Sequence, residues 1–183
     1  DVHATFFTLG WVAQRHGGLM RRIVDAGHEL ASHGWDHERV FRFDRDSFAA
    51  DLERSKKVLE DASGAAVNGY RAPSFSIDQR TPWAYMALAE QGFAYSSSVA
   101  PISHDHYGWR EAPRFAFKPL PWADLIEIPV TTAHFAGRRL AAGGGGVKLQ
   151  DRQRIGGFPI GNIVRHQEEF GRAPAKRLFV DDG

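Results

Sequence analysis

GHELASHGWDH, at residues 27–37, joins a strand-like run to two histidines four residues apart, His33 and His37. If the chain turns helical at His33, this spacing brings both imidazoles onto one side of a single turn. Two ring nitrogens so arranged are a natural way to offer ligands to a divalent metal, with Asp36 available as a further ligand or hydrogen-bond partner. Surface histidine pairs show the same spacing, so the metal site and the plain surface pair both remain open.

The residues before this segment predict a strand and a helix. Residues 4–9 are mostly β-branched or aromatic and are followed by Gly10, which is typical of a buried strand. Residues 11–26 have apolar side chains at helical spacing, with an interruption at Gly17-Gly18 that favours a short helix followed by a longer one. With the strand at residues 28–32, this order predicts a βαβ unit and a parallel sheet with a right-handed crossover.

The same alternation continues after residue 37. We expect helices at residues 46–61 and 81–91 and strands within 67–76, where the strand runs into a loop at Pro73, and at 93–99 and 125–132. The first of these helices should bury Phe48, Leu52, Ser55 and Leu59, and the second should begin at Thr81-Pro82. Repeated βα units of this kind indicate an α/β fold, either a barrel or an open sheet.

Polar residues follow three of the predicted strands. His33 ends the second strand, Arg71 and Ser74 end the third, and serines at 96–98 end the fourth. In α/β barrels and open α/β sheets, functional sites gather at the carboxyl ends of parallel strands. The sequence therefore predicts a site at this edge of the sheet.

The loop at residues 100–121 is rich in proline, histidine and aromatic residues, including His104, His106 and Tyr107. The two histidines could form a second metal site, because alternate residues of a strand share a face. We favour a substrate-binding lip, in which aromatic rings stack on the faces of sugars or other rings.

Composition limits the remaining classes of function. The chain has 183 residues, 43% of them hydrophobic and 25% charged, which is typical of a single globular domain. A net charge of +1 gives no indication of a nucleic-acid partner, and no stretch has the about 20 apolar residues of a membrane span. With no cysteine present, any metal ligands must be His, Asp or Glu.

The motifs at residues 4–7, 27–37 and 70–75 resemble the polysaccharide deacetylases of the NodB-homology carbohydrate esterase family. The segments at 96–99, 104–108 and 125–130 are similar to the branch found in bacterial exopolysaccharide loci. The resemblance covers residues 1–146, an incomplete deacetylase domain, and leaves residues 147–183 as a divergent tail. It implies a distorted or incomplete (β/α) barrel that hydrolyses N-acetyl groups on a polysaccharide. It does not indicate an oligomeric state, and it is compatible with the bacterial cytoplasm or the cell envelope.

The resemblance also implies roles for individual residues. His33 and His37 would be ligands of a divalent metal, most often zinc, and Arg71 would orient a carboxylate base. Ser74 would lie where a backbone N–H helps to hold an oxyanion. His104, His106 and Tyr107 are the substrate contacts expected from the lip itself, apart from the resemblance. These roles suit amide hydrolysis, which needs an activated water molecule, a base, an acid and oxyanion donors.

Two family motifs are missing from their usual places, so the chain looks truncated at both ends. The family's first strand ends in an acidic pair that supplies the base and a metal ligand, and its last strand carries a histidine acid. This chain ends instead with Arg-Leu-Phe-Val followed by Asp181, Asp182 and Gly183, which has the form of the first motif. The tail is either unrelated sequence or a first strand restored by circular permutation.

Three functions follow as hypotheses. The first is a metal-dependent polysaccharide deacetylase, and the second is an inactive or carbohydrate-binding relic that lacks the catalytic carboxylates. The third is a relative of the allantoinases, which act on small cyclic amides; the histidine spacing argues against it.

Overall fold

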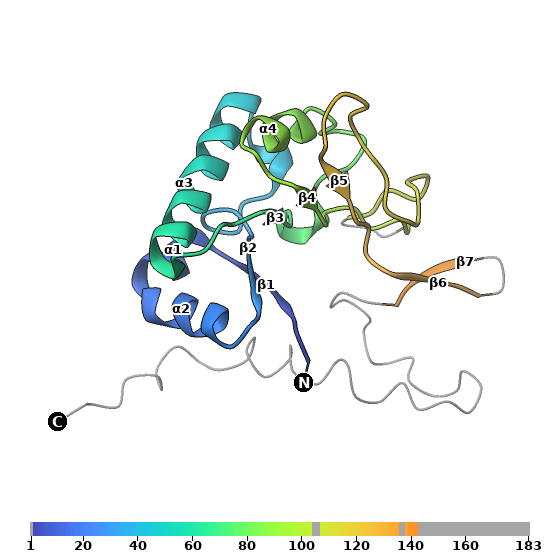
Figure 1. The fold of residues 1–183 in the computed structure, drawn as a ribbon. Helices are drawn as coiled ribbons and strands as arrows, with labels where there is room; N and C mark the ends of the chain where they lie inside the picture. Colours follow the sequence, from blue (N-terminus) through green and yellow to red (C-terminus); the bar gives the residue numbers. More distant parts are fainter. Residues whose placement is uncertain (1, 104–106, 136–137, 143–183) are drawn as a thin grey trace, which may run out of the picture. The chain divides into compact units, whose positions relative to one another are not determined.

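The computed structural model describes residues 2–103, 107–135 and 138–142, which belong to one compact unit. Its elements are β1 (Thr5–Thr8), α1 (Gly10–Arg15), α2 (Gly17–Asp25), β2 (Glu29–Ser32), η1 (Val40–Arg42), α3 (Arg45–Ser63), β3 (Gly69–Tyr70), η2 (Pro73–Phe75), α4 (Ala84–Glu90), β4 (Tyr95–Ser96), β5 (Ile126–Glu127), β6 (Thr132–Phe135) and β7 (Arg138–Ala141). Strands and helices alternate up to β4, as consecutive βα units require (Figure 1).

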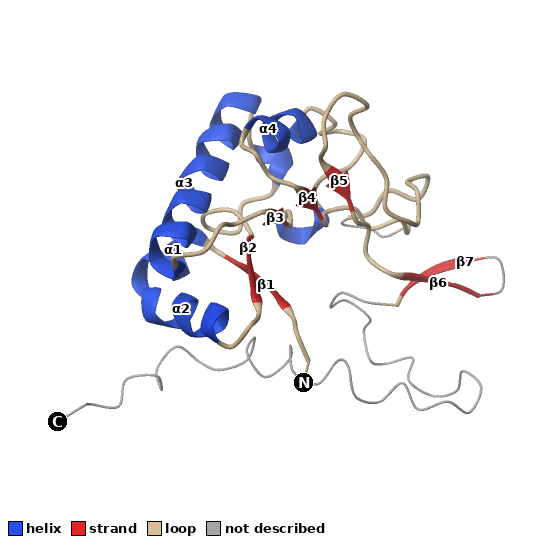
Figure 2. Ribbon diagram, viewed as in Figure 1, coloured by secondary structure: helices blue, strands red, loops and turns tan. Residues whose placement is uncertain are grey.

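The five strands β1 to β5 form a parallel sheet in sequence order. Helices α1 to α4 gather on one side of this sheet (Figure 2). Within the described part of the chain, β1 and β5 are the two edges and do not pair with each other, so the sheet does not close. The α/β class and an incomplete (β/α) barrel are confirmed.

Helix α3 forms the centre of the helical layer, and its buried stripe is the one predicted. Phe48, Leu52, Ser55 and Leu59 recur at helical spacing and are fully buried. The helix begins slightly earlier than predicted because Asp44 caps it, accepting a hydrogen bond from the Ser47 backbone N–H at 2.8 Å. A reciprocal bond from the Asp44 N–H to the Ser47 hydroxyl completes a capping box.

Three predicted strands are much shorter than expected. The segments predicted at 67–76, 93–99 and 125–132 each contribute only a two-residue strand, although Thr132 also begins β6. The reason lies in the backbone donors that would extend the ladder. The Ala72 N–H donates to the Ser98 hydroxyl, and the N–H groups of Ser98 and Val99 donate to the Glu127 carboxylate. Side chains thus replace the strand-to-strand bonds at the carboxyl edge.

Two other elements differ from the sequence prediction. Helix α4 begins at Ala84, because Thr81 and Ala84 are joined in a turn and Pro82 lies inside it. The antiparallel pair β6–β7 was not predicted. No helix in the described ranges is long and apolar enough to cross a membrane.

Candidate active site

The carboxyl ends of three neighbouring strands bring His33, Arg71 and Ser97 together. The last residues of β2, β3 and β4 are aligned in register, and each of these three residues comes next in its strand. Because successive side chains of a strand alternate between faces, all three turn away from the face that their preceding residues occupy. The predicted clustering of strand-end polar residues is therefore observed.

His33 is held in one tautomer by the backbone of the next strand. Its Nδ1 lies 2.6 Å from the carbonyl oxygen of Arg71, and a carbonyl can only accept, so Nδ1 carries the proton. Burial lowers the pKa of His33 to about 4, and the nearby charges of His37 and Arg71 act in the same direction. The ring is therefore neutral at pH 7, and its Nε2 has a free lone pair, as a metal ligand requires.

The second histidine meets the first, but not through a helix. The ring centroids of His33 and His37 are 5.1 Å apart. The chain between them bends rather than forming the helical turn considered above, with left-handed φ values of 79° at Gly34 and 70° at His37. Glycine suits its position, since an added Cβ would lie 3.1 Å from an Asp51 carboxylate oxygen. The juxtaposition of the rings thus depends on a left-handed turn.

Arg71 is fixed by polar and aromatic contacts. Its Nε donates to the Ser97 carbonyl at 2.9 Å, and its Nη2 donates to the Ser97 hydroxyl at 2.7 Å. The guanidinium lies 4.1 Å from the centre of the Phe7 ring, a cation–π distance. Within the described residues, no carboxylate forms an ion pair with Arg71. A half-buried guanidinium without an ion-pair partner favours the binding of an anion beside it.

The segment after Arg71 is strained. Ser74 and Phe75 have left-handed φ values of 54° and 50°, which non-glycine residues rarely adopt. The Ala72 N–H bond to Ser98 and the Phe75 N–H bond to the Ala72 carbonyl hold the turn. Such strain persists where the surroundings impose it and gathers at functional sites. His37, Ser74 and Phe75 are the three non-glycine residues of positive φ in the described chain, and all of them lie around this site.

Asp51, on α3, holds the loop between His33 and His37 by hydrogen bonds to its backbone. Both of its carboxylate oxygens accept from the backbone N–H of Trp35, at 3.3 and 3.2 Å. Burial raises the pKa of Asp51 to about 6, and the negative charge of Asp36 adds to the rise. The sequence prediction missed this residue, because no motif marks a carboxylate that reaches a loop from a separate helix.

The raised pKa of Asp51 predicts a pH-dependent stability. An acid whose pKa is higher in the folded state stabilises the fold below its unfolded pKa, and this contribution is lost as pH rises through about 6. Replacing Asp51 with asparagine removes the pH dependence but keeps an acceptor for the Trp35 N–H. Because Asp51 is partly exposed, we expect Asp51→Asn to gain only about 1 kcal/mol over wild type between pH 4 and pH 8.

Urea unfolding at the two pH values measures this difference. Asp25→Asn, at an exposed position, serves as the control and should show no such gain. An equal difference between wild type and Asp51→Asn at both pH values would contradict the assignment.

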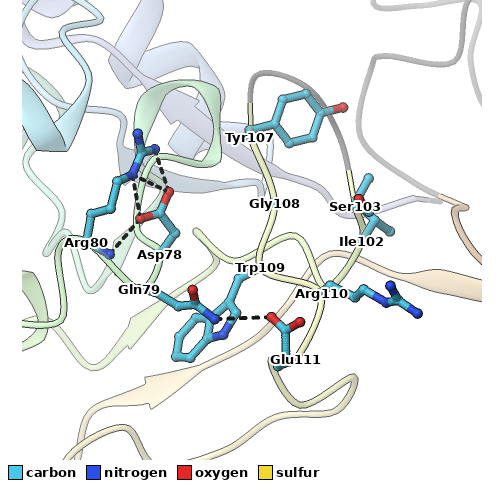
Figure 3. A pocket seen from close by; sticks show the side chains of 10 residues that line it. All are labelled: Asp78, Gln79, Arg80, Ile102, Ser103, Tyr107, Gly108, Trp109, Arg110 and Glu111. Atoms are coloured by element: carbon cyan, nitrogen blue, oxygen red, sulfur yellow. Dashed lines mark hydrogen bonds and ion pairs between the residues drawn. The ribbon is translucent and has the colours of Figure 1, made fainter.

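A polar cavity of about 520 Å³ lies beside the predicted substrate lip. Figure 3 shows Tyr107 and Trp109 at its wall, with the Asp78–Arg80 ion pair and the hydrogen bond from Gln79 to Glu111 along its rim. Tyr107 also packs on Phe75, with ring centroids 5.6 Å apart, which links the lip to the strained segment. His104 and His106 lie outside the described residues.

The donors present fit part of a metal site. The His33 and His37 rings offer two imidazole nitrogens, which are ligands of the kind that zinc prefers. Among the described residues, no group of three or more His, Cys, Asp or Glu side chains is placed to hold a metal. Asp181 and Asp182, the predicted carboxylates, are not among those residues. The histidine pair therefore fits as half of a coordination sphere.

Sequence comparisons are consistent with this geometry. A family model described as polysaccharide deacetylase matches residues 1–93, more than half of the 183-residue chain. The chain belongs to the polysaccharide deacetylase family. The family resemblance drawn from the motifs is thereby confirmed. A second model, described as a domain of unknown function (DUF3473), matches residues 97–149 of this deacetylase-family chain.

The matches to relatives and to solved structures cover only part of each of those proteins. A peptidoglycan deacetylase of Helicobacter pylori is 32% identical over 96 residues, which are 52% of this chain and 32% of that protein. A solved putative polysaccharide deacetylase from Mycobacterium smegmatis has a TM-score of 0.56 and 33% identity, covering 69% of this chain and 40% of that one. An allantoinase structure has a TM-score of 0.55 at 21% identity, which supports the fold alone. The chain thus spans about a third of the curated relative's length.

Proposed function

We propose that this chain carries the metal-binding side of a hydrolase that removes N-acetyl groups from a polysaccharide. The observation that carries the proposal is the His33–His37 pair, in a member of the deacetylase family, at the carboxyl edge of a parallel sheet. The peptidoglycan deacetylase of Helicobacter pylori supports an N-acetylated glycan as the substrate class. Zinc is the metal proposed, because neutral imidazoles are among its usual ligands.

Each residue of the site would have a separate task. His33 and His37 would hold the metal, which when bound lowers the pKa of water and polarises a carbonyl. Arg71 would attract and orient a carboxylate base through its fixed positive charge. The turn at Ser74 would present a backbone N–H to the oxyanion of the amide-hydrolysis intermediate. Tyr107, together with His104 and His106, would contact the sugar chain at the lip.

A second function, an inactive carbohydrate-binding relic, also has a specific observation in its favour. The described residues place only two metal ligands together and no carboxylate beside Arg71. A metal held by two histidines keeps several open positions and binds weakly. The relic would retain the lip and bind glycan without releasing acetate.

Acetate release distinguishes the two functions. Purified chain with zinc, incubated with N-acetylglucosamine oligomers, is expected to release acetate, and a chelator should stop the release. His33→Ala/His37→Ala should lose nearly all of this activity, because the metal loses both histidine ligands. His16→Ala, an exposed histidine between α1 and α2, is the matched control and should retain it. Glycan binding by all three proteins without acetate would instead support the relic.

A further inference from the structure

Glu127 is a carboxylate enclosed in the protein interior behind the candidate site. It ends β5 and has no exposed surface. Its Oε1 accepts two backbone hydrogen bonds, from Ser98 at 2.8 Å and from Val99 at 2.9 Å. Its Oε2 and the hydroxyl of Tyr85 on α4 are buried as well. A group so enclosed cannot touch a substrate, and burial raises the pKa of Glu127.

The peptide group that Glu127 holds is the same one that holds Arg71. The Ser98 N–H and the Ser97 carbonyl belong to a single planar peptide unit. Glu127 accepts from its N–H, while the Arg71 Nε donates to its carbonyl at 2.9 Å. The Glu127 acceptor oxygen thus lies at the positive end of the peptide dipole, and the guanidinium lies at its negative end. This arrangement holds the peptide between a hydrogen-bond acceptor on one side and a cation on the other.

Two hydroxyl groups also connect residues 97 and 98 to Arg71 and to the strained segment after it. The Ser98 hydroxyl accepts from the Ala72 N–H at 2.9 Å, and the Ser97 hydroxyl accepts from the Arg71 Nη2 at 2.7 Å. Movement of residues 97 and 98 would therefore release the guanidinium and the backbone that follows Arg71. Because His33 donates to the Arg71 carbonyl, the histidine ring would lose its alignment as well.

We infer that Glu127 is a positioning residue for Arg71, acting through the Ser97–Ser98 peptide group. The inference rests on the proposed function only in giving Arg71 a task at the site. The length of the Glu127 side chain is what matters. A side chain of the same length with an acceptor oxygen preserves the hydrogen bonds from the Ser98 and Val99 N–H groups, and a shorter side chain does not.

The Arg71 Nε–H gives a direct signal in nitrogen–proton NMR of the full chain, without metal or substrate, and its assignment follows from its loss in Arg71→Lys. Glu127→Gln keeps the length and one acceptor oxygen, so the signal should stay in place and remain protected from solvent exchange. Glu127→Asp keeps the carboxyl group but withdraws the oxygen by one methylene, so exchange should accelerate at least about tenfold. Tyr85→Phe, which leaves Glu127 Oε1 untouched, is the control and should match wild type.

An unchanged Arg71 signal in Glu127→Asp, or equal perturbation in Glu127→Gln and Glu127→Asp, would overturn the inference. This readout needs no catalysis, so a chain that releases no acetate refutes the proposed function and leaves this test intact. Where acetate is released, Glu127→Asp should lower kcat about tenfold at unchanged KM. It should have no further effect in an Arg71→Ala background, because residues that act through one another are not additive.

Discussion

Replacing Phe48 with alanine should lower the free energy of unfolding by about 3–5 kcal/mol. Phe48 is fully buried on α3, and its ring centroid lies 5.9 Å from that of Tyr70 and 5.7 Å from that of Trp83. These contacts join α3 to the sheet and to the residue before α4. Alanine would leave a cavity where α3, the sheet and the residue before α4 meet, and a loss of this size can exceed half of a domain's stability.

Urea unfolding followed by tryptophan fluorescence measures the change. Phe115→Ala, at a side chain that is 78% exposed, is the matched control and should change stability by less than about 0.5 kcal/mol. A loss at Phe48 no larger than at Phe115 would contradict the position given to α3 at the centre of the core.

Replacing Arg71 with alanine should reduce acetate release about 100-fold or more in a chain that is otherwise folded. The substitution removes the fixed cation beside His33 and leaves the Ser97 carbonyl and hydroxyl without their donors. Arg71→Lys should recover little, because an ammonium cannot reproduce the two-point contact of a guanidinium.

The reference for this measurement is Arg22→Ala, an exposed arginine of α2. It should match wild type in acetate release. Equal rates for Arg71→Ala and Arg22→Ala would show that Arg71 has only a structural part in the site.

The fold could be predicted well where one segment carries its own periodic pattern. The buried stripe of α3 follows from a single helical repeat. The predicted division into a short and a longer helix is observed, although the break falls at His16 and Gly17-Gly18 begin α2. Strand ends were less predictable. Their ladders stop where side chains such as Ser98 and Glu127 take over the backbone donors, and these partners come from distant segments.

The site could be predicted in part for the same reason. His33, His37 and Arg71 lie in short motifs beside strands, so their approach at one sheet edge follows from the parallel topology. The left-handed backbone at His37 cannot be derived from a four-residue spacing, and the helical turn considered from the sequence was wrong.

Two supporting residues had a weaker signal or none. A lone acid in the apolar run at residues 125–130 is the one sign that could have marked Glu127, because a charge in a buried strand needs partners. Asp51 has no comparable mark, since its role depends on how α3 packs under the histidine loop.

Calorimetric titration with zinc tests the central claim most directly, that His33 and His37 form a metal-binding pair. The wild-type chain should bind zinc with a saturable heat that His16→Ala retains. His33→Ala/His37→Ala should show none of that heat, because the mutation removes both nitrogen ligands. Equal zinc binding by the wild-type chain and the double variant would contradict the account.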